Sequence, residues 1–171
     1  MAHEIFFDRT RLVDAVQLAF DDPAAYVKNR PWMGSGDGDD FGWEALLDQM
    51  KEPCDGSSAR LVTFDWKASP EWIRDGVQWL IQCFSDDGLN WDWFDAHVAD
   101  LAEKEWRPGD IADDLLRECG QRALAIDLAL ISFTRGDSNE VLAIDVQQAD
   151  RILELAAQAN HGQDLFVLRR T

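Results

Sequence analysis

Apolar positions recur at strand and helix spacing along the second half of the chain. Residues 61–64, Leu-Val-Thr-Phe, are apolar or β-branched and predict a strand over 60–65. Ser69-Pro70-Glu71 combines a hydroxyl cap, a proline and an acid, which predicts a helix start followed by an apolar stripe over 73–84. After the break at Pro108-Gly109, we expect a further helix over about 110–120, with Asp110 as its cap.

Alternating residues predict the strands of the C-terminal third. Leucine and isoleucine occupy every second position from Leu124 to Leu130, and the turn residues at 135–139 precede a returning apolar strand at 141–146. These two strands should form a hairpin. A helix over about 148–159 and a last strand at 165–168 complete the pattern.

Two regions are less regular. Residues 89–94 fit either a short strand or an aromatic loop, and a helix over 95–105 would follow, with Val98 and Leu101 on its apolar side. Residues 1–57 contain short helical patterns around an acidic, glycine-rich loop and end in a break over 53–58. We therefore predict one domain over 1–171, with a helical N-terminal portion (1–57) and an α+β core (58–171).

Strands mixed with helices and joined by one hairpin specify the fold class. We expect an α+β fold with a mostly antiparallel sheet of about four strands and helices on one face, preceded by the N-terminal helical portion. Hydrophobic residues make up 46% of the chain, which is enough for a folded core.

The net charge of the chain indicates which class of partner it binds. The chain has 33 Asp plus Glu against 16 Lys plus Arg, a net of −17 over 171 residues. Such an excess destabilises a compact state through self-repulsion, so it is better explained by a surface that meets a cationic partner. Nucleic acid and anionic membranes are disfavoured as direct partners. No run of about 20 apolar residues and no signal-peptide pattern occurs, and three widely spaced cysteines (Cys54, Cys83, Cys119) suggest a reducing cytoplasm.

Motifs for metal binding and catalysis are weak. Asp37, Asp39 and Asp40 begin like a calcium loop, but Phe41 stands where an oxygen ligand is required and Asp48 where a bidentate glutamate belongs. No zinc, phosphate-loop or nucleophile motif is present. We expect no metal, no cofactor and no enzymatic activity. A small metal-dependent enzyme that uses its Asp and Glu residues remains an alternative, as does a housekeeping protein whose charge serves solubility.

Aromatic and acidic residues alternate in the segment Asn90-Trp91-Asp92-Trp93-Phe94-Asp95. Tryptophan is common among the residues that anchor interfaces, and the neighbouring carboxylates would pair with partner Lys or Arg side chains. The competing interpretation is that Trp91 and Trp93 are partly core residues. The stretch from Val62 to Glu71 contains a second such group, Phe64-Asp65-Trp66-Lys67.

The stretch Val62 to Glu71, the sequence Trp91-Asp92-Trp93-Phe94 and the hairpin turn Arg135-Gly136-Asp137-Ser138 together resemble an uncharacterised bacterial domain family over residues 58–171. That resemblance implies no activity. In general character the chain also looks like the immunity proteins of bacterial toxin systems, which are small, acidic and cytoplasmic.

Our hypothesis is therefore an acidic cytoplasmic protein that neutralises a basic partner, such as a cognate toxin that acts on nucleic acid. Such a toxin needs a cationic site for phosphates, and carboxylates can occupy that site. The residues predicted to bind the partner are Asp37, Asp39, Asp40, Asp86, Asp87, Trp91, Asp92, Trp93 and Asp95.

Overall fold

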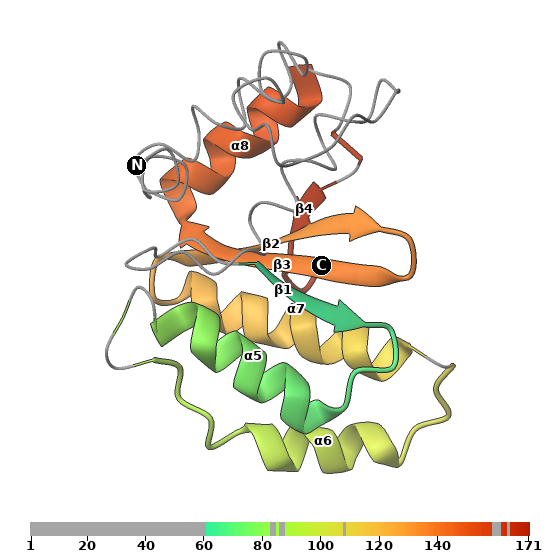
Figure 1. Cartoon of the computed structure of the whole chain (residues 1–171). Helices are drawn as coiled ribbons and strands as arrows, with labels where there is room; N and C mark the ends of the chain where they lie inside the picture. The colour runs from blue at the N-terminus through green and yellow to red at the C-terminus, as the bar shows by residue number, and fades with distance from the viewer. Residues whose placement is uncertain (1–60, 83–84, 86–87, 108, 159–161, 164) are drawn as a thin grey trace, which may run out of the picture.

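A computed structural model describes residues 61–82, 85, 88–107, 109–158, 162–163 and 165–171 (Figure 1). Within these ranges the chain forms four strands and four helices. In chain order they are β1 (Leu61–Asp65), α5 (Pro70–Gln82), α6 (Phe94–Ala102), α7 (Asp110–Leu124), β2 (Leu128–Arg135), β3 (Ser138–Asp145), α8 (Val146–Gln158) and β4 (Leu165–Val167). The predicted helical portion over 1–57 lies outside the described residues.

The four strands form one sheet in the order β1-β3-β2-β4, and every neighbouring pair is antiparallel. Strands β2 and β3 are the predicted hairpin, with Arg135 opposite Ser138 and Gly136 at a φ of 59° in the turn between them. A left-handed φ favours glycine, which explains why this residue type stands at the turn. The predicted α+β class and the antiparallel four-stranded sheet are confirmed for the described part of the chain.

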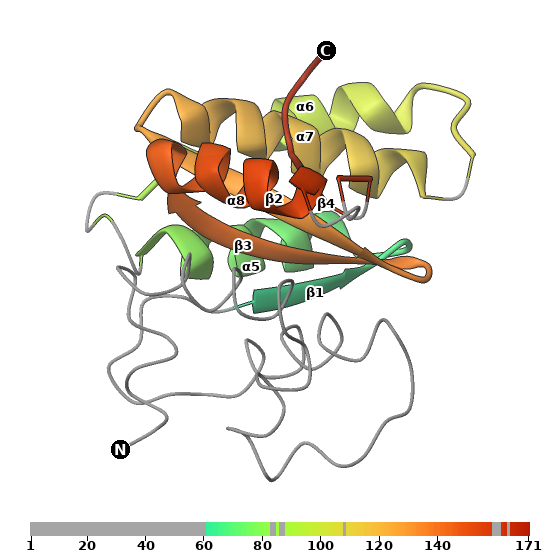
Figure 2. The same ribbon diagram turned by 90° about the horizontal axis from the view of Figure 1, so that it is seen from above.

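Helices cover both faces of the sheet. Helices α5 and α7 lie against one face with α6 beside them, whereas α8 lies on the opposite side (Figures 1 and 2). The prediction of helices on one face is therefore wrong. Its physical reason is visible in β2, where consecutive residues from Leu128 to Phe133 are buried, so both faces of the strand require a cover.

The connection between α7 and β2 also differs from the prediction. Alternation from Leu124 predicted a strand there, but α7 continues to Leu124 and the strand begins at Leu128. Between them, Asp127 has a φ of 60°, and Ile126 is 40% exposed rather than buried in the sheet. Aspartate tolerates the left-handed conformation, so a tight turn forms where alternation alone suggested extended chain.

The two helix starts behave differently. At α5 the backbone N–H of Trp72 donates to Ser69 Oγ at 3.2 Å, which confirms the predicted cap. At α7 the cap residue is Gly109, with a φ of 95°, so the prediction of Asp110 as the cap is wrong. The Asp110 carboxylate instead accepts a hydrogen bond from the backbone N–H of Arg107 at 2.8 Å and stabilises the turn that precedes the helix.

None of the helices in the described ranges is both long and apolar enough to cross a membrane.

Candidate functional site

The segment from Asn90 to Glu105 contains four of the predicted partner-binding residues. Its first residues form a turn that leads directly into α6, so the aromatic-loop interpretation is confirmed and the strand is not. Asn90 organises this turn, since its side-chain oxygen accepts from the backbone N–H of Asp92 at 2.8 Å and its carbonyl accepts from the Trp93 indole at 2.8 Å. The turn directs the indoles toward the core and leaves Asp92 exposed.

Trp91 and Trp93 are half-buried and form an aromatic cluster with Phe94. The two indoles stack with centroids 6.0 Å apart, and each meets the buried Phe94 ring edge-on. The Trp91 indole N–H donates to the side chain of Gln78 on α5. Both rings pack against the hydrophobic core, so they hold this segment on the body of the protein. Their role as anchors for a partner stays a prediction.

The carboxylates of the same segment point outward. Asp92 and Asp95 are exposed, and so are Asp100, Glu103 and Glu105, which the sequence analysis did not single out. We call these five residues the α6 acidic segment. For Asp100 a helical spacing signal was available, because this residue lies on the side of α6 away from Val98 and Leu101.

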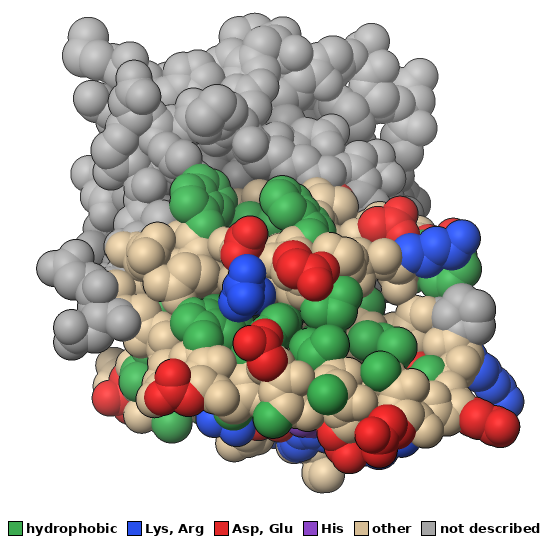
Figure 3. Space-filling view, turned by 90° about the horizontal axis from the view of Figure 1, so that it is seen from below, with side chains coloured by type: hydrophobic (Ala, Val, Ile, Leu, Met, Phe, Trp, Pro, Cys, Tyr) green, Lys and Arg blue, Asp and Glu red, His purple; other side chains and the backbone are tan. Residues whose placement is uncertain are grey.

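Most carboxylates of the α6 acidic segment have no ion-pair partner in the part of the chain that the structure describes. Lys104 forms an ion pair with Asp100 at 2.8 Å, and it lowers the pKa of that carboxyl. Among the described residues, no ion pair joins the carboxylates of Asp92, Asp95, Glu103 or Glu105. Figure 3 shows the corresponding face of the molecule, on which acidic side chains, with some Lys and Arg side chains between them, lie around exposed hydrophobic ones. This arrangement leaves negative charge available to a partner.

The carboxylates of helix α7, unlike most of those in the α6 acidic segment, form ion pairs or accept hydrogen bonds. Asp113 pairs with Arg117 at 2.7 Å, and Glu118 pairs with Arg122 at 2.8 Å. From the end of the chain, Arg170 donates to Asp114 at 2.9 Å and also to Glu118. Burial raises the pKa of Asp114 and Glu118, but the hydrogen bonds from Arg170 and from His97 or Arg122 outweigh it, so both pKa values are lowered.

His97 and Arg122 connect this ion-pair network to the aromatic cluster. His97 Nε2 lies 2.8 Å from Asp114 Oδ2, and the same ring meets the Trp93 indole edge-on at 5.6 Å. The guanidinium of Arg122 lies 4.2 Å from the centroid of the Trp93 ring, a favourable cation–π distance. The network therefore fixes α6 on α7, so that the outward face of α6 is held in one orientation.

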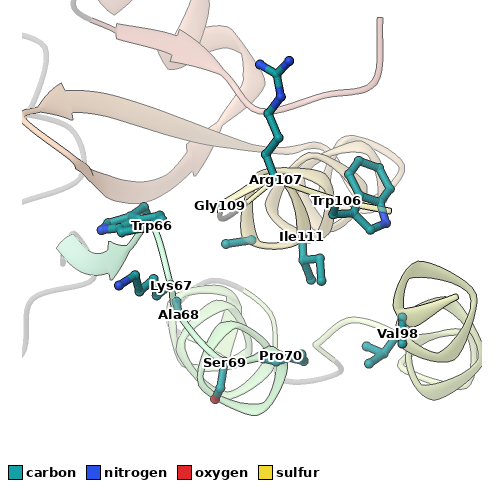
Figure 4. Close-up of a pocket in the computed structure, with 12 residues that line it drawn as sticks. Trp66, Lys67, Ala68, Ser69, Pro70, Val98, Trp106, Arg107, Gly109 and Ile111 are labelled. Atoms are coloured by element: carbon teal, nitrogen blue, oxygen red, sulfur yellow. The ribbon is translucent and has the colours of Figure 1, made fainter. Parts of the chain in front are cut away.

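A pocket of about 490 Å³ opens at the C-terminal end of α6 (Figure 4). Its wall comes from α6 itself, the loop between β1 and α5, and the start of α7. The lining is mostly apolar and consists of Trp66, Lys67, Ala68, Ser69, Pro70, Val98, Ala102, Trp106, Arg107, Gly109, Ile111 and Ala112. This volume is within the range of about 300–1,000 Å³ typical of ligand pockets.

The remaining predicted residues, Asp37, Asp39, Asp40, Asp86 and Asp87, lie outside the described part of the chain, and so does the loop considered for calcium. Among the residues that are described, no group of three or more His, Cys, Asp or Glu side chains is arranged to hold a metal ion. Burial raises the pKa of Cys119 to about 12, so this thiol is unsuited to act as a nucleophile.

Comparison with known proteins gives one match. A family model described as a domain of unknown function (DUF6630) matches residues 2–166. The match includes most of residues 1–57, for which the sequence motifs had suggested no counterpart. No curated protein and no solved structure is similar enough to count as a match.

Proposed function

We propose, from the premise that the chain belongs to the DUF6630 family of unknown function, that it is an acidic binding protein that neutralises a basic protein partner. In its most specific form, the proposal is an immunity protein for a bacterial toxin that acts on nucleic acid. Its predicted place of action is the cytoplasm, where such a toxin would meet its target.

One observation carries this proposal: the α6 acidic segment gathers exposed carboxylates, four of which have no ion-pair partner among the described residues. Exposed like charges repel one another only weakly, but they add nothing to the stability of the fold either. Helix α7 shows that the same chain can neutralise its carboxylates with arginines placed four residues later. Carboxylates left without an ion pair among the described residues, on α6 and the turns at its two ends, are therefore better explained by a function outside the fold.

The expected mode of action is electrostatic. A toxin that acts on nucleic acid holds phosphates with Lys and Arg side chains, and carboxylates on an inhibitor can occupy the same positions. Complementary potentials also raise the association rate, up to about 10⁸–10⁹ M⁻¹s⁻¹ at low salt. Rapid capture matters for a protein that must neutralise its partner before damage occurs.

The test compares two sets of neutralising substitutions. In the first, Asp92→Asn, Asp95→Asn and Glu103→Gln remove three charges from the α6 acidic segment. In the control, Asp127→Asn, Asp137→Asn and Asp150→Asn remove three exposed charges from other parts of the molecule. Partners that co-purify from the native cell extract with the wild-type chain and both variants are identified by mass spectrometry. The association rate of any basic partner is then measured against salt concentration.

We expect a basic polypeptide that the wild type and the control variant retain and the α6 variant loses. Its association rate with the wild type should fall steeply as salt rises, and its toxicity on expression should disappear when this chain is co-expressed. An association rate that does not change with salt, or equal loss in both variants, would contradict the proposal.

A further inference from the structure

We infer that the exposed face of α5 anchors the basic partner by binding one of its arginine side chains between Trp72 and Trp79, against the carboxylate of Asp75. This inference rests on the proposed function and adds the chemistry of the partner's contact residue. It places aromatic anchors on α5 in addition to the predicted pair, Trp91 and Trp93, which are half-buried.

Two exposed tryptophans lie on one face of α5. Trp72 is 52% exposed and Trp79 is 39% exposed, and Ile126 is the other exposed large hydrophobic residue in the described part of the chain. Seven residues, about two helical turns, separate the tryptophans, so their side chains leave the helix on the same side, about 10 Å apart along its axis. Single exposed apolar residues are ordinary, but two neighbouring indoles are typical of an interface.

The core holds one of these rings in place. Trp72 meets the buried Phe64 ring with centroids 6.4 Å apart, so part of its indole rests on the core while half of the side chain stays open to solvent. The two tryptophans lie beside the buried stripe of α5, which consists of Ile73, Gly76, Val77, Leu80 and Ile81. An anchor that is already held in this way loses little conformational freedom when a partner binds.

A carboxylate lies between the two tryptophans on the helix surface. Asp75 comes three residues after Trp72 and four before Trp79, and side chains at these spacings are neighbours on a helix. The Asp75 side chain is 67% exposed. Its Oδ1 accepts a hydrogen bond from Arg74 Nε at 3.3 Å, and no described residue binds its Oδ2. An exposed pair of this kind is weak, so a partner cation can join or replace Arg74.

The charges near Asp75 also favour an incoming cation. Glu71 is exposed, lies one helical turn before Asp75 and forms no ion pair with a described residue. The Arg74 guanidinium lies 5.7 Å from the Phe94 ring centroid, on the side of α5 that faces α6. The side that carries the two tryptophans therefore presents carboxylates next to the indoles.

This face of α5 is adjacent to the α6 acidic segment. Gln78 of α5 accepts a hydrogen bond from the Trp91 indole at the start of that segment. Both helices lie on the lower side of the molecule in Figure 1, which is the side seen in Figure 3, where acidic side chains lie next to exposed hydrophobic ones. A basic protein that docks on the α6 acidic segment can therefore contact the exposed indoles of α5 as well.

Two indoles beside a carboxylate favour arginine over lysine. A guanidinium is planar and weakly hydrated, so it stacks on an aromatic face while its N–H groups bind a carboxylate. A lysine ammonium is a compact and strongly hydrated charge, and it gains less from the same surface. Arginine is also a common phosphate-binding residue, so the phosphate site of a toxin that acts on nucleic acid supplies the side chain that α5 would bind.

Capped tripeptides test the preference for arginine on the full chain labelled with ¹⁵N. Acetyl-Gly-Arg-Gly-amide is compared with acetyl-Gly-Lys-Gly-amide, which has the same charge, and with acetyl-Gly-citrulline-Gly-amide, which has nearly the same shape and no charge. The indole N–H resonances of Trp72 and Trp79, assigned with Trp72→Phe and Trp79→Phe, report on binding. The ionic strength is kept constant during each titration.

We expect the arginine probe to shift both indole resonances and to bind about two- to fivefold more tightly than the lysine probe. Asp75→Asn should weaken binding of the arginine probe by a similar factor, whereas Asp150→Asn, at an exposed position on α8, should not change it. If arginine binds no better than lysine or citrulline, or if neither indole resonance shifts, the inference is wrong.

A second comparison separates this inference from the proposed function. Trp72→Ala removes one exposed indole, and Ile126→Ala removes a 40% exposed apolar side chain outside α5. The basic partner should bind Trp72→Ala about 30-fold more weakly than the wild type, as expected for an interface anchor, and Ile126→Ala should bind it as the wild type does. Amide spectra that match the wild type show that both variants are folded.

The outcomes of this comparison differ for the two proposals. If Trp72→Ala binds the basic partner as tightly as the wild type does, while the neutralised α6 variant loses it, the α5 anchor is wrong and the proposed function stands. If the wild type retains no basic partner from the cell extract, the proposed function fails, whatever the tripeptides show about arginine binding on α5.

Discussion

The α6 acidic segment and helix α7 are both rich in carboxylates, but their carboxylates differ in how they are paired. Each of the four acids of α7 accepts a hydrogen bond or forms an ion pair with a described residue, from Asp110 at its start to Glu118. In the α6 acidic segment, Asp100 alone has such a partner among the described residues. The comparison shows that the number of acidic residues does not measure the charge that a surface offers.

The difference arises from what each helix must do within the fold. Helix α7 packs beside α5 on the sheet, and its residues Asp114 and Glu118 meet Arg170 where solvent is partly excluded. A carboxylate in that setting is stable only when it is paired. Helix α6 has one face toward the core and the other toward water, so its acids can remain unpaired at small cost.

The largest expected effect comes from separating α7 from the end of the chain. A Cβ atom at Gly120 would lie 2.1 Å from the backbone oxygen of Leu168, so Gly120→Ala forces the two segments apart. We expect a loss of about 1–3 kcal/mol in the free energy of unfolding, typical of overpacking, measured by urea denaturation. The neighbouring exposed substitution Gln121→Ala should change it by less than about 0.5 kcal/mol. If the two variants are equally stable, the contact between Gly120 and Leu168 rearranges without a cost in free energy, and the prediction is wrong.

A smaller loss should follow when the ion pairs across this contact are removed. Arg170→Gln takes the guanidinium from Asp114 and Glu118, whose side chains are 16% and 14% exposed. Because Arg170 is itself 42% exposed, solvent screening moderates the effect, and we expect a loss of about 1–2 kcal/mol at pH 7. Arg169→Gln, an exposed neighbour without an ion pair among the described residues, is the matched control and should leave stability almost unchanged.

The pH dependence of unfolding tests whether the ion pairs of Arg170 cause this loss of stability. Because the pKa values of Asp114 and Glu118 are lowered in the folded state, their contribution to stability is complete above the unfolded values of about 4. It is lost as pH falls through the lower folded values, where both groups take up protons. The difference in unfolding free energy between wild type and Arg170→Gln should therefore be constant from pH 7 to 5 and shrink toward pH 3. A difference that grows in acid would contradict the ion-pair assignment.

Local patterns predicted much of this fold, and long-range contacts account for the rest. The Ser69 cap, the hairpin and the outward Asp92 and Asp95 all depend on residues close together in sequence, and spacing alone reveals them. Arg170 reaches Asp114 because Leu168 donates its N–H to the Leu130 carbonyl beside β4, a pairing that no local pattern contains. Likewise, Leu124 and Ile126 fit the alternating pattern that predicted a strand. Only tertiary packing determines that α7 extends to Leu124 and that β2 begins at Leu128.

The half-burial of Trp91 and Trp93 also depends on both local and long-range contacts. Their sequence neighbours are acidic, which suggested an exposed recognition surface, but the Asn90 turn rotates both rings onto Phe94 and the core. The acids exposed beside them were predictable from alternation along the segment, whereas the hydrogen bond between Trp91 and Gln78 on α5 depends on tertiary structure.

The smallest expected change in the free energy of unfolding comes from neutralising the α6 acidic segment. Asp92→Asn, Asp95→Asn and Glu103→Gln remove charges that pair with nothing among the described residues, so together they should alter the free energy of unfolding by less than about 0.5 kcal/mol. A slight gain at low salt is the direction that relief of like-charge repulsion gives, and it should vanish as salt screens the charges. Asp113→Asn, which breaks the pair with Arg117, should instead lose stability at low salt, because it removes an attraction rather than a repulsion. Urea denaturation at low and high salt measures both. If the α6 substitutions destabilised the chain as the α7 one does, their carboxylates would serve the fold and not a partner.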